Sequence, residues 1–289
     1  MRLVVLCAAL GLAVLGVQAR QQTPAKPTTA SEWNTPFEAF QAAGPIYYVG
    51  TADLAAFLIT TPQGHILIDG ALPEGAALIE QGIRALGFKV TDVKILLNTQ
   101  AHYDHVGSLA AMQKATGGQV MVMEGDAELI ASGGKGDYLF GDSYPFPATK
   151  VDRVLKHGDT VSLGGITLRA LHTPGHTKGS TTWQTAIVDD GRPLTVIFSA
   201  STSVNPGTEL PTMATYPTVG ADYEKTFRML SELRPDVWFG GHGSFFGLKD
   251  KRARQKAGEV NPFVDPAGWK ASVDRRWAAH KALKPGKQS

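Results

Sequence analysis

Six consecutive residues, Gln100 to His105, hold two histidines, an aspartate and a side-chain amide directly after an apolar run. The run, residues 93–97, is short and rich in branched side chains, so it predicts a buried strand. Helical spacing of apolar residues resumes over 106–116 and stops at two glycines. The segment between them is therefore a strand-to-helix loop, in which the backbone is free to aim several side chains at one point. We expect a site at the carboxyl end of this strand.

The side chains of this loop match the ligands of zinc. Neutral imidazoles from His102 and His105 and a carboxylate from Asp104 are the nitrogen and oxygen ligands that this cation accepts. The plainer interpretation is a solvated loop, but this density of ligands after a buried strand favours a metal site. The role of Gln100 stays open, because its amide oxygen is either a weak metal ligand or a hydrogen-bonding group of the loop.

The amino terminus has the pattern of a secretory signal. A charged start precedes an apolar run over residues 3–17, and Val17-Gln18-Ala19 is typical of a cleavage site. We predict a signal peptide over 1–19 and a flexible leader over 20–35. The apolar run is too short to span a bilayer, so no membrane association is expected. The sole cysteine, Cys7, lies in this run, and export without disulfides indicates the bacterial periplasm or the extracellular space, of which we predict the periplasm.

Length and composition fit one ordinary globular enzyme. Residues 36–289 contain no evident linker, so we predict a single domain and expect a monomer. The chain is 43% hydrophobic and 19% charged, with a formal net charge of +2. This near-neutral balance speaks against a basic groove for a phosphate backbone, so we expect no nucleic-acid partner.

Strand patterns recur in two halves of the chain, each followed by helical spacing. This rhythm predicts an α/β fold in which two sheets pack face to face with helices outside, a four-layer sandwich. Predicted strands are 46–49, 54–60, 65–68, 93–97 and 119–123 in the first half, and 152–155, 160–163, 166–170, 181–188, 194–199 and 237–239 in the second. Predicted helices are 73–86, 106–116, 124–131, 222–233 and 265–283, with a frayed tail over 286–289.

Two further histidines follow predicted strands in glycine-containing loops. His176 lies between Pro174-Gly175 and Gly179, and His242 lies among glycines after the strand at 237–239. Because the ligand set of the 100–105 loop is incomplete, both are predicted to be metal ligands. His172 alternates with strand residues and is expected either to be packed or to support a ligand from behind.

Two other features allow two interpretations each. Asp69 follows a predicted strand and is either a turn carboxylate or a group that orients a ligand histidine. Residues 132–147, rich in glycine and aromatic side chains, either cover the site or pack on the surface.

Three motifs together resemble the metallo-β-lactamase superfamily. They are the 100–105 loop, the sequence 173–180 around His176, and Gly241-His242-Gly243-Ser244. Their order and loop contexts are similar to those of the subclass B3 enzymes, and the resemblance spans nearly all of the mature chain. It implies an αβ/βα sandwich with a two-zinc site at one edge.

The resemblance also implies a role for each site residue. The first zinc would be bound by Gln100, His102 and His176, and the second by Asp104, His105 and His242. The family pattern has histidine at the position of Gln100, and this chain resembles a minority B3 type with glutamine there. Ser201 and Ser203 match positions that face the substrate carboxylate or metal-bound water, and Ala200 stands where an aspartate is common.

The implied activity is opening of the β-lactam ring of small-molecule antibiotics. A zinc ion lowers the pKa of bound water to about 7 and polarises a carbonyl, and Asp104 would orient the attacking hydroxide. Rival interpretations are a glyoxalase II-like thioesterase or a lactonase on the same scaffold, or a zinc-binding protein with little catalysis. The export signal and the B3-like loops favour the lactamase.

Overall fold

The computed structural model describes residues 33–288. The predicted signal peptide and most of the predicted leader lie outside these residues. Within them, no helix combines the length and the apolar character needed to cross a bilayer.

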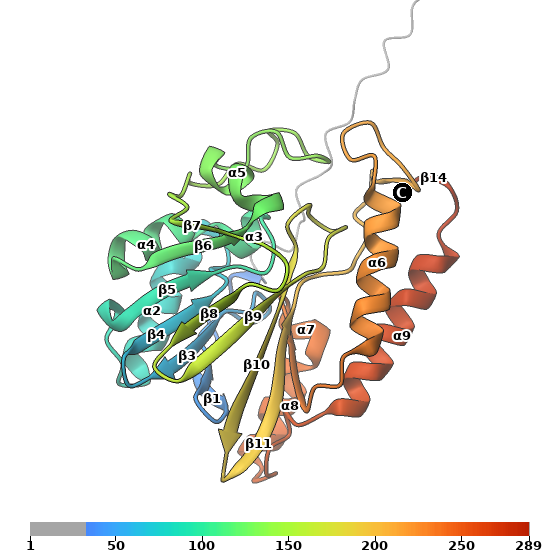
Figure 1. Cartoon of the computed structure of the whole chain (residues 1–289). Coiled ribbons are helices and arrows are strands. Elements are labelled where there is room, and N and C mark those ends of the chain that lie inside the picture. The colour runs from blue at the N-terminus through green and yellow to red at the C-terminus, as the bar shows by residue number, and fades with distance from the viewer. Residues whose placement is uncertain (1–32, 289) are drawn as a thin grey trace, which may run out of the picture.

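Two sheets face each other and helices cover their outer sides (Figure 1). The first sheet has the strand order β1-β2-β3-β4-β5-β6-β7, and the second has the order β13-β11-β10-β9-β8. In Figure 1, α2, α4 and α5 lie outside the first sheet, and α6 and α9 lie outside the second. The predicted four-layer αβ/βα sandwich is confirmed.

The strands of the first sheet are β1 (Phe40–Ala43), β2 (Ile46–Tyr48), β3 (Phe57–Thr61), β4 (Gly64–Ile68), β5 (Val93–Leu97), β6 (Gln119–Met123) and β7 (Arg153–Leu155). Those of the second are β8 (Thr160–Leu163), β9 (Ile166–His172), β10 (Thr181–Asp189), β11 (Arg192–Ser199) and β13 (Val237–Gly240). The helices are η1 (Pro73–Gly75), α2 (Ala76–Ala85), η2 (Val90–Asp92), α3 (Tyr103–Val106), α4 (Leu109–Thr116), α5 (Glu124–Ser132), α6 (Val219–Glu232), α7 (Gly243–Phe246), α8 (Leu248–Lys256) and α9 (Pro266–Ala282).

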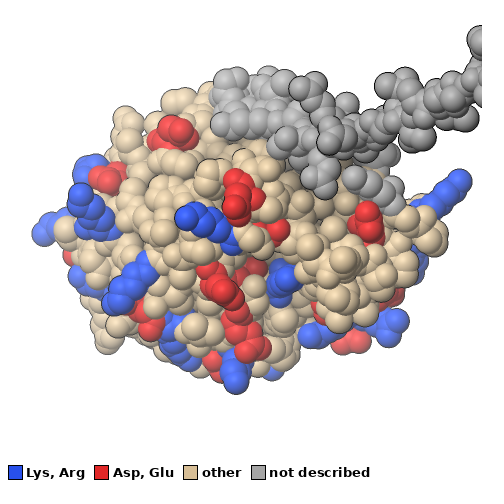
Figure 2. All heavy atoms as spheres, turned by 90° about the horizontal axis from the view of Figure 1, so that it is seen from above, with Lys and Arg blue, Asp and Glu red and all other residues tan. Residues whose placement is uncertain are grey.

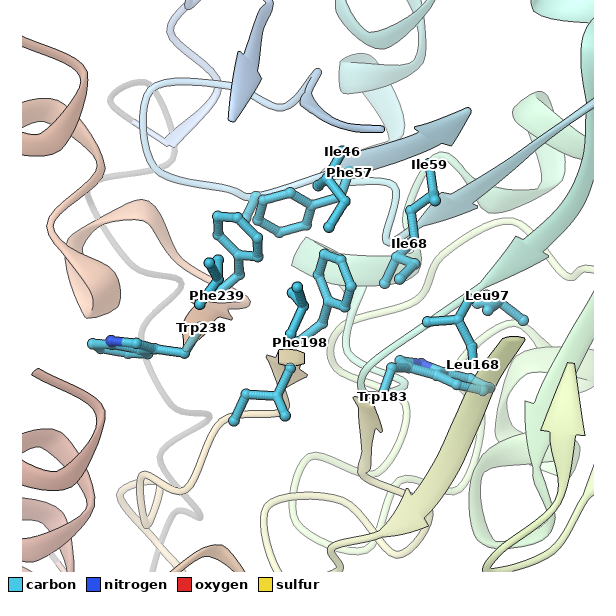
Figure 3. Close-up of a cluster of buried hydrophobic side chains, with 14 of the residues drawn as sticks. Ile46, Phe57, Ile59, Ile68, Leu97, Leu168, Trp183, Phe198, Trp238 and Phe239 are labelled. Atoms are coloured by element: carbon cyan, nitrogen blue, oxygen red, sulfur yellow. The ribbon is translucent and has the colours of Figure 1, made fainter. Parts of the chain in front are cut away.

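Alternation along the strands divides the apolar side chains between two cores. In β3, Phe57 and Ile59 face the second sheet, whereas Leu58 faces the helices. Side chains of a strand point alternately to its two faces, so a sheet covered on both sides needs continuous apolar runs. The inner core contains large aromatic rings from both sheets (Figure 3). The ring centroid of Phe57 lies 5.1 Å from that of Phe198 and 4.6 Å from that of Phe239.

Three local predictions were wrong. The strand predicted at 152–155 belongs to the first sheet, because β7 pairs in parallel with β6. The tail predicted to be frayed contains β14 (Gly286–Lys287), which pairs with β12 (Glu209–Leu210). The helix predicted over 106–116 is interrupted at Gly107-Ser108, so that α3 and α4 are separate.

The ends of central strands from both sheets meet at one edge of the sandwich. Thr181 donates its backbone N–H to the carbonyl of Thr99 at 2.7 Å, and the indole N–H of Trp183 donates to the carbonyl of Asn98 at 2.9 Å. These bonds join the start of β10 to the end of β5. The loop that follows β5 therefore lies beside the loop between β9 and β10.

Candidate active site

One group of predicted ligands, Asp104, His105 and His242, comes from both sheets. Asp104 and His105 lie in α3 directly after β5, and His242 follows β13. Their potential ligand atoms all lie within 4.8 Å of one another. Asp104 Oδ2 is 3.4 Å from Nε2 of His105 and 3.4 Å from Nε2 of His242. We call these three residues the second ligand group.

In this group the backbone at Gly241 lies close against the imidazole ring of His105. A Cβ atom on Gly241 would lie 2.6 Å from Cε1 of His105. A side chain at this position would displace the imidazole, so the glycine before His242 is required by contact between the two loops.

The charges in the second ligand group are strongly coupled. Burial alone would lower the pKa of His105, but the Asp104 and Asp69 carboxylates outweigh it and raise that pKa to about 10. Burial raises the pKa of Asp104, yet His105 and His242 hold that pKa well below its usual range. Neither ring nitrogen of His105 has a hydrogen-bond partner among the described residues. The group thus favours positive charge and has unused nitrogen donors, which is the chemistry of a cation site.

The remaining predicted ligands, Gln100, His102 and His176, form the first ligand group. His102 Nδ1 lies 3.1 Å from His176 Nε2. Burial lowers the pKa of His102 to about 4 and that of His176 to about 3, so both imidazoles are neutral near pH 7. Neutral rings offer lone pairs to a metal without first losing a proton.

The amide of Gln100 has a partner outside the group. Its Oε1 accepts a hydrogen bond from the backbone N–H of Ser201 at 2.7 Å, and Gln100 is 1% exposed. The loop after β11 is therefore tied to the loop after β5 at the position of a predicted ligand. A carbonyl oxygen has a second lone pair, so this bond is compatible with a ligand role and also matches the alternative role in loop structure.

Other groups fix the orientation of the rings of two predicted ligands, His176 and His242. Asp53 Oδ2 lies 3.0 Å from Nδ1 of His242, while its Oδ1 accepts from the N–H of Ser244 at 2.8 Å. His176 donates from Nδ1 to the carbonyl of Ser203 at 2.8 Å. These bonds leave Nε2 of both rings directed at the ligand groups.

Asp69 lies behind the second ligand group. It accepts from the N–H and the hydroxyl of Thr99, both at 2.7 Å, and lies 3.6 Å from Nδ1 of His105. Asp69 therefore holds the turn after its strand and also faces His105, and its role in orienting a metal ligand stays a prediction.

A cavity of about 630 Å³ opens above both ligand groups. Ser201 and Ser203, predicted to contact substrate, line it, as do Phe140 and Tyr144 from the 132–147 segment. No Lys or Arg is among its described lining residues. The lining residues are Trp33, Asp53, Gln100, His102, Tyr103, Asp104, Phe140, Tyr144, His176, Ser201, Ser203, Asn205, Pro206, His242, Ser244 and Phe245.

Comparison with known proteins agrees with this architecture. The model of the metallo-beta-lactamase superfamily matches residues 54–242, which include both ligand groups. The chain belongs to the metallo-beta-lactamase superfamily. Solved structures of metallo-beta-lactamases also match nearly the whole fold.

Two of these metallo-beta-lactamase structures illustrate the likeness. Native FEZ-1 from Legionella gormanii is 40% identical, with a TM-score of 0.84 over 86% of this chain and 95% of that chain. The class B3 di-zinc enzyme LRA-12 from an Alaskan soil metagenome is 38% identical, with a TM-score of 0.83 over 87% of this chain and 96% of that chain.

Curated relatives match over shorter stretches. A hydroxyacylglutathione hydrolase from Bradyrhizobium is 27% identical over 166 residues, which are 57% of this chain and 54% of the relative. The chain covers 33% of the length of a probable metallo-hydrolase from Burkholderia pseudomallei. The likeness to the metallo-beta-lactamase structures is thus the more complete one.

Sequence reasoning missed Asp53, whose carboxylate faces the ring of His242. Its partner His242 is 189 positions away in the chain, and a local pattern carries no signal for such a contact.

Proposed function

We propose that this protein is a zinc-dependent hydrolase that opens the β-lactam ring. The observation that carries the proposal is that five of the six predicted ligands line one cavity, while the sixth, His105, lies beside Asp104 and His242. The nearly complete match to metallo-beta-lactamase structures supports the substrate class. Six residues are proposed to act as ligands: Gln100, His102 and His176 at the first zinc, and Asp104, His105 and His242 at the second.

The distances fit zinc. Two nitrogen ligands of a tetrahedral zinc lie roughly 3.3 Å apart when each bond is about 2.0–2.1 Å. The facing nitrogens of His102 and His176 are 3.1 Å apart. In the second ligand group, Asp104 Oδ2 is 3.4 Å from each imidazole Nε2. Imidazole and carboxylate donors without cysteine are also the ligands of catalytic zinc sites.

Bound zinc supplies a Lewis acid and lowers the pKa of water to about 7. The protein supplies positioning. Asp104 stays ionised because His105 and His242 lower its pKa. At neutral pH its carboxylate can therefore accept a hydrogen bond from an attacking water and orient that water. Asp53 and the Ser203 carbonyl hold the rings of His242 and His176 in one tautomer.

The cavity lining fits a small acid with an apolar substituent. Because no Lys or Arg lines the cavity among the described residues, the hydroxyls of Ser201 and Ser203 are proposed to bind the substrate carboxylate. The aromatic rings of Phe140, Tyr144 and Phe245 offer apolar surface to the rest of the molecule. Figure 2 shows basic and acidic side chains interspersed over the face in view, so this face presents no continuous basic surface.

A thioesterase is the second candidate function. The curated relatives named hydroxyacylglutathione hydrolase favour it, although this chain matches only 34% to 54% of their length. We further propose that the enzyme is a monomer and, from the export pattern in the sequence, that it lies in the periplasm.

Hydrolysis of a penicillin, a cephalosporin, a carbapenem, a hydroxyacylglutathione thioester and a lactone, each with and without added zinc, tests the proposal. We expect zinc-dependent ring opening of at least one β-lactam at a higher kcat/KM than for the thioester or the lactone. Asp104→Asn should lower kcat by about 100-fold or more, because the orienting carboxylate is lost. Asp152→Asn, a carboxylate change away from the cavity, is the control and should leave kcat unchanged.

Two results would contradict the proposal. One is a thioester rate that exceeds every β-lactam rate at all zinc concentrations. The other is an Asp104→Asn variant that keeps the wild-type rate.

A further inference from the structure

Asp126 is a buried carboxylate without a role in the proposed chemistry. It is the third residue of α5, which begins directly after β6, and it is 1% exposed. No ion pair joins it to a Lys or Arg among the described residues. A buried ionised group without a cationic partner is held by hydrogen bonds instead.

Three donors surround the carboxylate, and all come from the loops that carry metal ligands. Oδ2 accepts from the N–H of Ala101 at 2.8 Å and from the hydroxyl of Thr177 at 2.7 Å. Oδ1 accepts from the N–H of Gly179 at 2.7 Å. Ala101 lies between two residues of the first ligand group, and Thr177 follows His176.

Helix capping does not account for these bonds. A capping side chain accepts from an N–H at the start of its own helix, whereas all three donors to Asp126 lie outside α5. The helix N-terminus still favours a negative charge at this position. Asp126 thus belongs to α5 but accepts hydrogen bonds from segments that follow strands of both sheets.

The segments approach closely enough to exclude side chains. A Cβ on Gly125 would lie 2.3 Å from the carbonyl oxygen of Lys178, and a Cβ on Gly179 would lie 2.3 Å from the nitrogen of Asp126. Backbone contact between the start of α5 and the 177–179 loop is therefore direct. A short carboxylate reaches the Gly179 N–H only because of this contact.

Hydrogen bonds join the two loops of the first ligand group on both sides of it, and Asp126 makes those on one side. On one side, the Thr181 N–H donates to the Thr99 carbonyl, which joins the start of β10 to the residue before Gln100. On the other side, Asp126 joins Ala101 to Thr177. His102 and His176 lie next to the residues of this second junction, and their facing nitrogens are 3.1 Å apart.

We propose that Asp126 is a positioning residue that holds the His102 and His176 loops at the separation required by one metal ion. The second ligand group has different supports, since His105 faces Asp69 and His242 faces Asp53. Loss of Asp126 is therefore selective for the first ligand group. This inference rests on the proposed metal site and not on the substrate.

Cobalt(II) is the probe, because its absorption spectrum reports each bound ion without any substrate. Titrations use the Gln100→His background, in which a third imidazole strengthens the first ligand group. We expect two bound ions in this background. Asp126→Asn should weaken the ion at the first group by about 10–100-fold, in the range of other residues that orient ligands. The ion at the second group should change by less than about 3-fold.

A milder pair of variants separates positioning from loss of folding. Thr177→Val removes one donor to Asp126 and should weaken the first cobalt ion, whereas Thr177→Ser keeps the hydroxyl and should restore its affinity. The matched control is Asp236→Asn. Its carboxylate accepts from the N–H of Thr195, near the end of β11 that is remote from the site, at 2.8 Å. It should change neither ion.

Three results would overturn the proposal: equal weakening of both ions by Asp126→Asn, unchanged affinity at the first group, or a Gln100→His chain that binds only one cobalt ion. Each would show that Asp126 does not position a metal-binding pair. Failure of β-lactam hydrolysis alone would leave the cobalt readout intact and would contradict only the proposed substrate.

Discussion

Single residues divide the site into two electrostatic environments. Burial lowers the pKa of His102 to about 4 and that of His176 to about 3, although the Asp137 carboxylate lies 3.8 Å from Nε2 of His102. His105 and His242 face carboxylates that raise their pKa despite burial. A metal ion must displace protons from the second ligand group but not from the first. The weaker donor Gln100 lies in the first group.

Gln100 provides a test at this scale. Gln100→His should raise metal affinity at the first ligand group by about 10-fold or more, because imidazole is a better donor than a neutral amide. The buried N–H of Ser201 loses its acceptor, so the metal-free protein should be destabilised by about 1–3 kcal/mol. Zinc titration against a chelator and urea unfolding measure the two effects.

The control for this experiment is Gln100→Met, which keeps the approximate size of the side chain without an amide. It should show the loss of stability without the gain in affinity. An unchanged zinc titration for Gln100→His would show that this position does not face the metal.

At the scale of elements, the carboxylate of Asp265 contacts both α8 and α9. Asp265 caps α9 by accepting from the N–H of Gly268 at 2.8 Å, and it pairs with Lys251 of α8 at 2.9 Å. The Lys251 side chain is 7% exposed. One residue therefore satisfies the start of a helix and also the charge of a buried lysine.

Asp265→Ala should destabilise the protein by about 1–2 kcal/mol for the lost cap, and by more because Lys251 is left unpaired. Burial raises the pKa of Asp265, but Lys251 and the Gly268 N–H outweigh it, so the net pKa is lowered. The stabilisation is thus present above the unfolded pKa and is lost as pH falls through the folded pKa. Urea unfolding of metal-free protein should show a larger difference from wild type at pH 6 than at pH 3.

Asp274→Ala is the matched control. Asp274 belongs to an exposed pair with Lys270 on α9, so its loss should change stability by less than about 1 kcal/mol. A difference between Asp265→Ala and wild type that grows toward pH 3 would contradict the assignment of the cap and the ion pair.

At the scale of the whole molecule, the proposed metal ligands come from both sheets of the sandwich. His102, Asp104 and His105 follow a strand of the first sheet, whereas His176 and His242 follow strands of the second. A metal held by residues from both sheets binds only the folded arrangement. Bound metal should therefore stabilise the protein as a whole.

Removal of metal with a chelator should lower the Tm, and added zinc should restore it. At a free zinc concentration 100 times the Kd, the expected stabilisation is about 2.7 kcal/mol. Differential scanning calorimetry of the chelated and zinc-loaded protein measures the shift. His105→Ala, which removes a ligand of the second group, should reduce it, and a Tm that is independent of zinc in the wild type would contradict metal binding by the fold.

Most strands were predicted well because their signal is local. The apolar run of β5 matches its predicted bounds, and alternation divides β3 between two cores. The signal fails where an element lacks an apolar pattern. The sequence of α8, Leu248–Lys256, is almost entirely polar and gave no prediction, and its Asp250 and Lys251 form ion pairs with Arg254 and Asp265.

The sequence by itself determined which side chains have metal-binding chemistry and which of them follow strands. Only the tertiary structure decided which groups meet, such as Asp53 with His242 and Asp126 with Ala101 and Thr177. The physical reason is the distance along the chain between the residues that make contact. Strand and helix patterns reflect burial over a few neighbouring residues, whereas these contacts depend on how two sheets pack and on the register of their strands.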